Sequence, residues 1–474
     1  FTPETLDLLM RIRRVEPAAI NWRGLAGNAL VLTLMALFLF RYVQAHQKNF
    51  HRVKNLYTMA LTSMIMTTVG SWVGLFIARS VADQYVTPPF NDATAYIWAL
   101  PVCAGAMLIT LLANDRFATV CSAFTAVVFG IVMSWNAQAM VFALLSSFAA
   151  IYGVRKYGKR TAILKAGFLV GLLNATTVLA LQCIKSAPPP ASQVLFEIAA
   201  AFAGGLLAVP VASFGLPIME WLFNALTDIR LLELSNLDNP LLRRLSLEAP
   251  GTYNHSVIVG TLAEQAAEEI GAHALFCRVA AYYHDIGKMT KPDYFVENMR
   301  DGENRHDRLS PRMSSLIIAS HVKEGIRLSE EFNLPRQVRD IIPQHHGTRL
   351  ITFFYRKAKK KEDIDAREIH ESDYRYPGPK PQTKEAAIFM MADSVEAAAR
   401  SVEDPTPAKF EEVIRAVSNA IVLDQQLDEC DLTFSDLAKI GASFQKTLTA
   451  VHHHRIAYPG FEFDRSRPRA VEAE

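Results

Sequence analysis

Residues 274–288, ALFCRVAAYYHDIGK, decide the fold class of the region around them. Their apolar residues recur at helical spacing and do not alternate as in a half-buried strand. The helical pattern ends at His284 and Asp285, an imidazole and a carboxylate, which are both side chains that bind divalent metals. This stretch therefore predicts a helix that delivers two candidate metal ligands at its end.

The region that surrounds this stretch is predicted to be helical throughout. Helical apolar spacing is found at 256–270, 274–285, 311–323, 325–332, 335–345, 385–402 and 407–427, and no run of alternating strands occurs between them. Because a helical bundle can place side chains from different helices around one centre, we expect an all-α domain with a central site.

Five histidines and two aspartates make up the candidate ligand set. They are His255, His284, Asp285, His321, His345, His346 and Asp393. One zinc ion needs three or four ligands, whereas seven nitrogen and oxygen side chains suit two ions that share a carboxylate, for which Asp285 is the natural choice. No CxxC pair occurs among the cysteines, so two ions of manganese or iron are favoured over structural zinc.

The first 216 residues follow a different pattern. The whole chain is 50% hydrophobic and 20% charged, a mixture that a membrane domain followed by a soluble domain explains. Seven apolar stretches approach the roughly 20 residues that cross a bilayer as a helix. They are 23–43, 57–79, 95–113, 117–134, 137–152, 162–184 and 193–216. We therefore expect seven transmembrane helices.

Lysine and arginine are distributed unevenly over the loops between these stretches. The loops and flanks after spans one, three and five hold ten of them, whereas those after spans two, four and six hold only Arg79 and Lys185. Because positive charge accumulates on the cytoplasmic side, we expect the soluble domain on the cytoplasmic side of the cell membrane and the N-terminus on the outer side. Arg11, Arg13, Arg14 and Arg23 argue against this orientation, but a large exported domain ahead of Phe1 would weaken their effect.

Five short motifs carry a family resemblance. They are Asn254-His255-Ser256, His284-Asp285-Ile286-Gly287-Lys288, Ala319-Ser320-His321, Gln344-His345-His346-Gly347 and Met391-Ala392-Asp393-Ser394. Together they resemble the HD-domain metal phosphohydrolases. With the seven spans and the stretches 241–245, 249–253 and 294–298, the chain looks like the seven-transmembrane HD receptors that hydrolyse cyclic di-AMP.

The resemblance implies a role for each candidate ligand. One metal would bind His255, His284, Asp285 and Asp393, and the other Asp285, His321, His345 and His346. Lys288 follows His284 by one helical turn and would bind a phosphate oxygen beside Asp285, although a solvated lysine at a helix end is the alternative. The further candidates for phosphate or adenine contacts are Lys291, Tyr294, Asn298 and Arg400.

The resemblance also implies an organisation of the chain. We expect an extracellular juxtamembrane remnant at 1–21, the transmembrane domain at 22–216, a linker or signalling helix at 217–240, the HD domain at 241–460 and a tail at 461–474. An amphipathic helix over 216–234 is compatible with a homodimer contact and equally with a helix along the membrane face. The charged segment 348–384 is expected to be solvated and to form a loop near the site.

The expected function is hydrolysis of cyclic di-AMP to pApA at two metals, regulated by an unknown extracellular ligand through the membrane domain. The Gly-Tyr-Pro signature of related enzymes that cleave cyclic di-GMP is absent, and Arg375-Tyr376-Pro377 is better explained as a turn. Two alternatives remain: a phosphohydrolase for cyclic di-GMP or another nucleotide, and a non-catalytic cyclic-dinucleotide receptor. The chain lacks a sustained basic face with interleaved aromatics, so nucleic-acid binding is not expected.

Overall fold

The computed structural model describes residues 2, 5, 21–46, 50–155, 161–186, 189–299, 304–365, 369–403 and 405–451. The chain divides into two compact units, an N-terminal unit of residues Phe1–Ile229 and a C-terminal unit of residues Arg230–Glu474. The expected tail at 461–474 and nearly all of the expected remnant at 1–21 lie outside the described residues.

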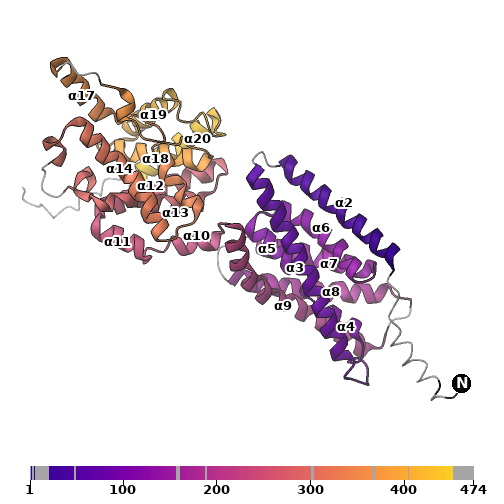
Figure 1. The fold of residues 1–474 in the computed structure, drawn as a ribbon. Coiled ribbons are helices and arrows are strands. Elements are labelled where there is room, and N and C mark those ends of the chain that lie inside the picture. The colour runs from indigo at the N-terminus through magenta and orange to yellow at the C-terminus, as the bar shows by residue number, and fades with distance from the viewer. Residues whose placement is uncertain are drawn as a thin grey trace, which may run out of the picture. The chain divides into compact units, whose positions relative to one another are not determined.

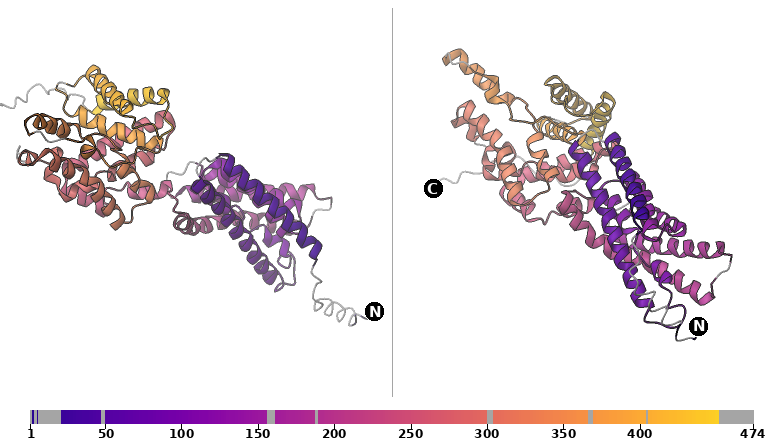
Figure 2. Two further views of the ribbon diagram at one scale, coloured as in Figure 1. Left: turned by 45° about the horizontal axis from the view of Figure 1, so that its top comes forward. Right: turned by 45° about the vertical axis from the view of Figure 1, so that its right-hand side comes forward.

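The N-terminal unit is a bundle of helices (Figures 1 and 2). In chain order they are α2 (Trp22–His46), α3 (Phe50–Ala82), α4 (Ala93–Ile97), α5 (Ala104–Leu112), α6 (Asp115–Val132), α7 (Ala137–Val154), α8 (Thr161–Ile184) and α9 (Ala191–Phe223). Among the described residues, six of these, α2, α3 and α6 to α9, are long and apolar enough to cross a membrane. The protein is therefore a membrane protein, and its described residues contain one continuous spanning helix fewer than expected.

The third expected span, 95–113, is where the prediction of seven continuous spanning helices is wrong. This stretch forms two short helices, α4 and α5, and Pro101 lies between them. Proline has no backbone N–H and its ring clashes with the preceding turn, so a continuous helix is interrupted. The 9 residues of α5 rise about 14 Å at 1.5 Å per residue, which is too short for a bilayer core.

The expected single helix over 216–234 is also wrong. Helix α9 continues through Pro217 to Phe223 and ends at Asn224, whose φ of 48° is left-handed. Asparagine tolerates this conformation better than most residues, and it commonly ends helices. A separate short helix, α10 (Asp228–Leu234), follows. The expected linker region therefore contains a helix end, a turn and a second helix.

The described part of the C-terminal unit is also helical, which confirms the all-α expectation. Its α-helices are α11 (Pro240–Glu248), α12 (Pro250–Ile270), α13 (Ala274–Tyr283), α14 (Pro311–Glu331), α15 (Arg336–Arg339), α16 (Ile341–Gln344), α17 (Thr352–Asp365), α18 (Lys384–Ala399), α19 (Pro407–Leu423) and α20 (Phe434–Val451). Five 3-10 helices complete it: η1 (Ile286–Thr290), η2 (Pro292–Tyr294), η3 (Val296–Asn298), η4 (Arg305–Arg308) and η5 (Glu371–Tyr374).

Three expected segments of this unit are organised differently in the structure. The expected helices 311–323 and 325–332 form the single helix α14, because Gly325 is accommodated within it. The expected helix 335–345 is divided into α15 and α16. The segment 348–384, expected as a loop, contains α17 and η5.

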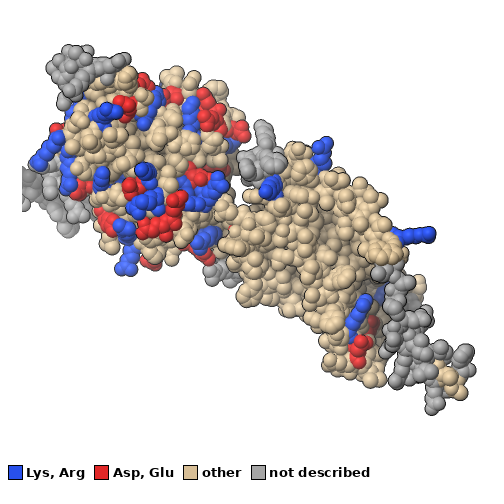
Figure 3. Space-filling model, in the orientation of Figure 1, with Lys and Arg blue, Asp and Glu red and all other residues tan. Residues whose placement is uncertain are grey.

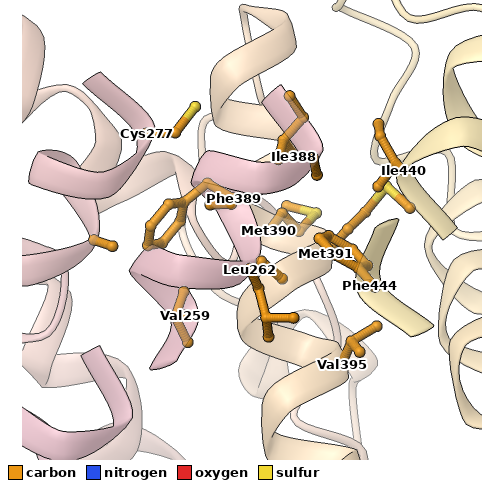
Figure 4. Packing of buried hydrophobic residues seen from close by; sticks show 14 of the residues in the cluster. Val259, Leu262, Cys277, Ile388, Phe389, Met390, Met391, Val395, Ile440 and Phe444 are labelled. Atoms are coloured by element: carbon orange, nitrogen blue, oxygen red, sulfur yellow. The ribbon is translucent and has the colours of Figure 1, made fainter. Parts of the chain in front are cut away.

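Helix α18 is the centre of the C-terminal unit. It packs against α12, α13, α16, α19 and α20, and its residues from Ala386 to Asp393 are all buried. Figure 4 shows Met391 and Val395 of α18 in the same cluster as Leu262 on α12 and Phe444 on α20. Apolar neighbours on so many sides fix the position of α18, so a polar side chain on it is held rigidly in the interior.

The visible surfaces of the two units differ in charge. In Figure 3, lysine, arginine, aspartate and glutamate cover much of the C-terminal unit, whereas most of the N-terminal unit is free of them. Leu30, Phe76 and Phe214, which lie on different long helices of the N-terminal unit, are each more than half exposed. Lipid can cover such apolar surface, which agrees with a membrane-embedded bundle.

Candidate metal centre

All seven candidate ligands converge within the C-terminal unit. His255 lies on α12, His284 directly after α13, Asp285 before η1, His321 on α14, His345 and His346 directly after α16, and Asp393 on α18. Six of the seven are no more than 6% exposed, and His346 is half-buried. Ligands that are far apart in the sequence are thus brought to one interior point by five helices.

The ligand atoms form two adjoining groups. His255, His284, Asp285 and Asp393 make up one, and His321, His345 and His346 the other; within each group the ligand atoms all lie within 4.8 Å of one another. This grouping agrees with the division that the family resemblance implies.

Asp285 joins the two groups. Its Oδ2 lies 3.0 Å from Nε2 of His284 and 3.7 Å from Nε2 of His255. Its Oδ1 lies 3.4 Å from Nε2 of His321 and 3.7 Å from Nε2 of His345. Each carboxylate oxygen therefore faces a different set of imidazoles, which is the arrangement that a carboxylate bridging two metals requires.

The Nδ1 atoms of three of the histidines are held by backbone carbonyl groups. Nδ1 of His284 is 2.8 Å from the carbonyl of Ala281, and the Nδ1 atoms of His321 and His345 have equivalent carbonyl partners three residues earlier in the chain. An Nδ1–H that donates to a carbonyl leaves Nε2 with a lone pair, and this arrangement is usual for histidines that bind metal.

Two buried atoms at the centre have no hydrogen-bond partner among the described residues: Nε2 of His284 and Oδ1 of Asp285. Leaving buried polar atoms unsatisfied is costly, and a cation would satisfy both of them. The residues present therefore fit a pair of divalent metal ions.

The electrostatics of the cluster also favour bound cations. Burial would raise the pKa of Asp285, but His284 and Lys288 hold it well below its usual range, so the carboxylate is ionised. Burial would lower the pKa of His284, but Asp285 and Asp393 raise it to about 10, so a bound metal would displace the proton from Nε2. Burial, together with His284, lowers the pKa of His345 to about 3, so His345 is neutral and can act as a ligand.

Lys288 lies beside the bridging carboxylate. Its Nζ is 2.6 Å from Oδ2 of Asp285 and 2.8 Å from Oε1 of Glu297. Burial alone would lower the pKa of Lys288, but these two carboxylates raise it, so the ammonium group is charged. The alternative interpretation from the sequence was a solvated lysine at a helix end. It does not describe Lys288, because the Lys288 side chain is held at the edge of the cluster.

The backbone of η1 lies unusually close to α14. A Cβ atom on Gly287 would collide with the carbonyl oxygen of His321 and would lie 2.5 Å from the backbone nitrogen of Gly325. Only glycine permits this approach at position 287. The glycine two residues after Asp285 therefore allows that aspartate and His321 to reach the same site.

The other predicted substrate contacts lie around the cluster with varied partners. Asn298 is buried and binds the backbone N–H and the hydroxyl of Thr252. Tyr294 packs against His306, and Lys291 is exposed. Arg400 forms an ion pair with Glu396. Of the predicted substrate contacts, Lys288 therefore lies closest to the candidate ligands, and Asn298 already has protein partners.

Two side chains that the sequence analysis did not single out contact the ligands. Glu396 Oε2 is 2.6 Å from Nδ1 of His255; it lies three residues after Asp393 on α18, so helical spacing could have revealed it. The ring of Tyr376 stacks on that of His346, with centroids 4.2 Å apart. Tyr376 was assigned to a turn, and no local signal in the sequence links it to His346.

Comparison with known proteins agrees with this geometry. Residues 21–227 match the family model described as a 7TM receptor with intracellular HD hydrolase, and residues 252–398 match the HD domain. The cyclic-di-AMP phosphodiesterase PgpH of Bacillus subtilis is 38% identical to this chain over 439 residues. The chain therefore resembles the 7TM HD receptors over both of its units.

One further relative and a solved structure show how far the similarity extends. PgpH of Listeria monocytogenes, also named a cyclic-di-AMP phosphodiesterase, is 38% identical over 436 residues. The alignments cover 90% and 92% of this chain, but only 60% and 59% of the Bacillus and Listeria proteins. A crystal structure of the Listeria PgpH HD domain with cyclic di-AMP is 47% identical, with a TM-score of 0.43; the match covers 46% of this chain and all of that one.

Proposed function

We propose that this chain is a membrane-anchored phosphodiesterase that hydrolyses cyclic di-AMP to pApA at two divalent metals. The observation that carries the proposal is the position of Asp285, whose two oxygens face two separate sets of histidines. Two relatives that align with at least 90% of the chain are named cyclic-di-AMP phosphodiesterases. This agreement favours cyclic di-AMP over other cyclic dinucleotides.

The proposed ligand assignment follows the two groups. One metal binds His255, His284, Asp285 and Asp393, and the other binds Asp285, His321, His345 and His346. When bound, a pair of divalent metals activates water and neutralises charge on the phosphoryl oxygens. Imidazole and carboxylate ligands without cysteine suit manganese or iron, and we propose one of these as the metal.

The side chains around the metals would orient the substrate. Lys288 can donate to a non-bridging phosphate oxygen, because its ammonium is charged and lies 2.6 Å from Asp285. Glu297 holds Lys288 in this position. Glu396 fixes the ring of His255. Water adds to phosphorus, the P–O3′ bond breaks, and the departing 3′ oxygen takes a proton. We further propose Lys291, Tyr294, Asn298 and Arg400 as weaker contributors to phosphate or adenine binding.

The membrane arrangement is part of the proposal. Lysine and arginine concentrate in the loops after α2, α5 and α7. With α4 and α5 together making the third of seven crossings, this distribution supports a cytoplasmic C-terminal unit and an outside N-terminus. An extracellular signal would then act through the N-terminal unit on the metal centre.

The test is hydrolysis by the purified full chain loaded with manganese or iron. Cyclic di-AMP and cyclic di-GMP are offered side by side, and His284→Ala serves as the inactive control. Metal-dependent formation of pApA that is lost in the control supports the proposal. Tight binding of cyclic di-AMP without turnover would make the protein a receptor, and preferred cleavage of cyclic di-GMP would contradict the substrate.

A further inference from the structure

A second cluster of polar side chains lies within the N-terminal unit. It consists of Asp92 at the start of α4, Gln182 near the end of α8, and Gln193 and Glu197 in the first turns of α9. Helix α9 packs against both α4 and α8. Glu197 is 2% exposed and Gln182 is 3% exposed. Acidic side chains buried among membrane helices are rare and usually functional, so this cluster requires an explanation.

Both carboxylates of the cluster are linked through glutamine side chains. Nε2 of Gln193 donates to Oδ2 of Asp92 at 2.6 Å and lies 3.4 Å from Oε1 of Glu197. Nε2 of Gln182 donates to Oε2 of Glu197. Three elements of the unit therefore bring two carboxylates and two amides to one place.

The cluster has more acceptors than donors. Oε1 of Gln182 is buried and has no hydrogen-bond partner among the described residues. Its own amide nitrogen is bound to Glu197, so the planar amide group keeps this oxygen beside the carboxylates. Exchanging the oxygen and nitrogen positions of the Gln182 amide would place its oxygen against the carboxylate oxygen of Glu197 and would leave its nitrogen without a partner. The unsatisfied atom is therefore an oxygen with a free lone pair.

The positive charge of Lys185 does not compensate for this excess of acceptors over donors in the cluster. Lys185 is close enough to act electrostatically on Glu197, but within the described chain it forms no ion pair with either carboxylate. Two carboxylates and an unpaired amide oxygen therefore share one nearby lysine. Burying so many acceptors without further compensation is costly.

We propose that this cluster binds a hard metal cation such as Ca²⁺ or Mg²⁺, with Asp92, Glu197 and Oε1 of Gln182 as ligands. Carboxylate and amide oxygens are the ligands that these ions prefer. Glu197 is the seventh residue of α9, which places it about 9 Å from the helix start at 1.5 Å per residue. The cluster therefore lies near one end of α9, where Asp92 is partly exposed. The proposal does not depend on the reaction at the metal centre.

Terbium luminescence on the full chain in detergent tests this site directly. Tb³⁺ is a hard cation, and Tyr96, which contacts the ring of Phe196 next to Glu197, can sensitise its emission. The metal centre is first saturated with manganese. We expect saturable emission that Ca²⁺ displaces, and an at least tenfold weaker affinity in Glu197→Gln and Asp92→Asn.

The matched control is Asp83→Asn, an exposed acidic residue just after α3 that lies outside the cluster. It should bind Tb³⁺ as the wild type does. Unchanged affinity in both cluster variants would overturn the proposal, as would a wild type without displaceable emission. If Glu197→Gln does not fold, the comparison of Asp92→Asn with Asp83→Asn decides the question, because Asp92 is only partly buried.

Discussion

The two units both bury polar side chains, but they use them differently. In the N-terminal unit many buried hydroxyls bond within their own helix; Ser122 and Thr125, for example, donate to carbonyls four residues earlier. In the C-terminal unit, side chains from five helices turn their free nitrogen and oxygen atoms towards one point. Burial of polar groups therefore does not by itself indicate chemistry, whereas convergence from separate helices does. In the cluster of Asp92, Gln182, Gln193 and Glu197, the N-terminal unit also brings polar side chains from separate helices together, as the C-terminal unit does at the metal centre.

The largest effect that this comparison predicts is for Asp285→Ala. Because Asp285 faces both groups of histidines, we expect loss of both metals and hydrolysis at background level. Elemental analysis and pApA formation measure the two effects. Asp307→Ala removes an aspartate that lies on the surface of the same unit and should leave both unchanged. Two metals retained in Asp285→Ala would show that the carboxylate is not the bridge.

The packing around α18 is tested by a pair of phenylalanines on α20. Phe444 is fully buried against the core, whereas Phe434 is 86% exposed. Phe444→Ala should lower the free energy of unfolding of the C-terminal unit by about 3–5 kcal/mol, and Phe434→Ala by no more than about 0.5 kcal/mol. Urea denaturation of fragment 230–474 measures both. Equal losses would mean that α20 does not support α18 as described.

A smaller effect is expected for Glu396→Ala, which removes the partner of Nδ1 of His255. Loss of such a partner typically weakens metal binding by about 10- to 100-fold. Competition with a chelator gives the metal affinity. Glu396→Gln keeps an acceptor oxygen and should restore part of the metal affinity. If Glu396 had a purely structural role, Glu396→Ala would instead lower stability without changing the metal affinity.

The smallest effect concerns helix contact in the N-terminal unit. A Cβ on Gly205 of α9 would collide with the backbone of Gly171 on α8, whereas a Cβ on Gly70 of α3 would meet nothing within 4 Å. Gly205→Ala should cost about 1–3 kcal/mol through overpacking. Gly70→Ala should be neutral or slightly stabilising, because alanine favours helices. Thermal denaturation of the full chain in detergent compares them, and equal melting temperatures would refute close packing of α8 on α9.

The sequence predicted the members of the candidate site better than the course of the helices. Histidine and aspartate bind metal because of their chemistry, so the seven candidates could be selected by residue type before their positions were known. Glu396 was missed although its helical spacing from Asp393 was visible. Tyr376 could not be found, because its contact with His346 depends on how the segment after α17 folds back.

The helix boundaries depend on effects that the spacing of apolar residues does not reveal. Pro101 interrupts the third apolar stretch, and its presence in the sequence could have prevented the count of seven spans. Pro210 and Pro217, in contrast, lie within α9 without ending it. Whether a proline breaks a helix depends on the neighbouring elements that hold the chain, and these are fixed only in the folded bundle.

The most direct test of the account is the number of transition metals bound to each chain. Purified full chain is loaded with manganese or iron and freed of excess ions, and the metal content is measured by mass spectrometry beside that of His284→Ala. The account predicts two ions per chain at the metal centre of the wild type, beyond any ion held by the cluster in the N-terminal unit, and fewer in the variant. One ion or none in a folded wild-type chain would contradict the bridged metal centre at Asp285.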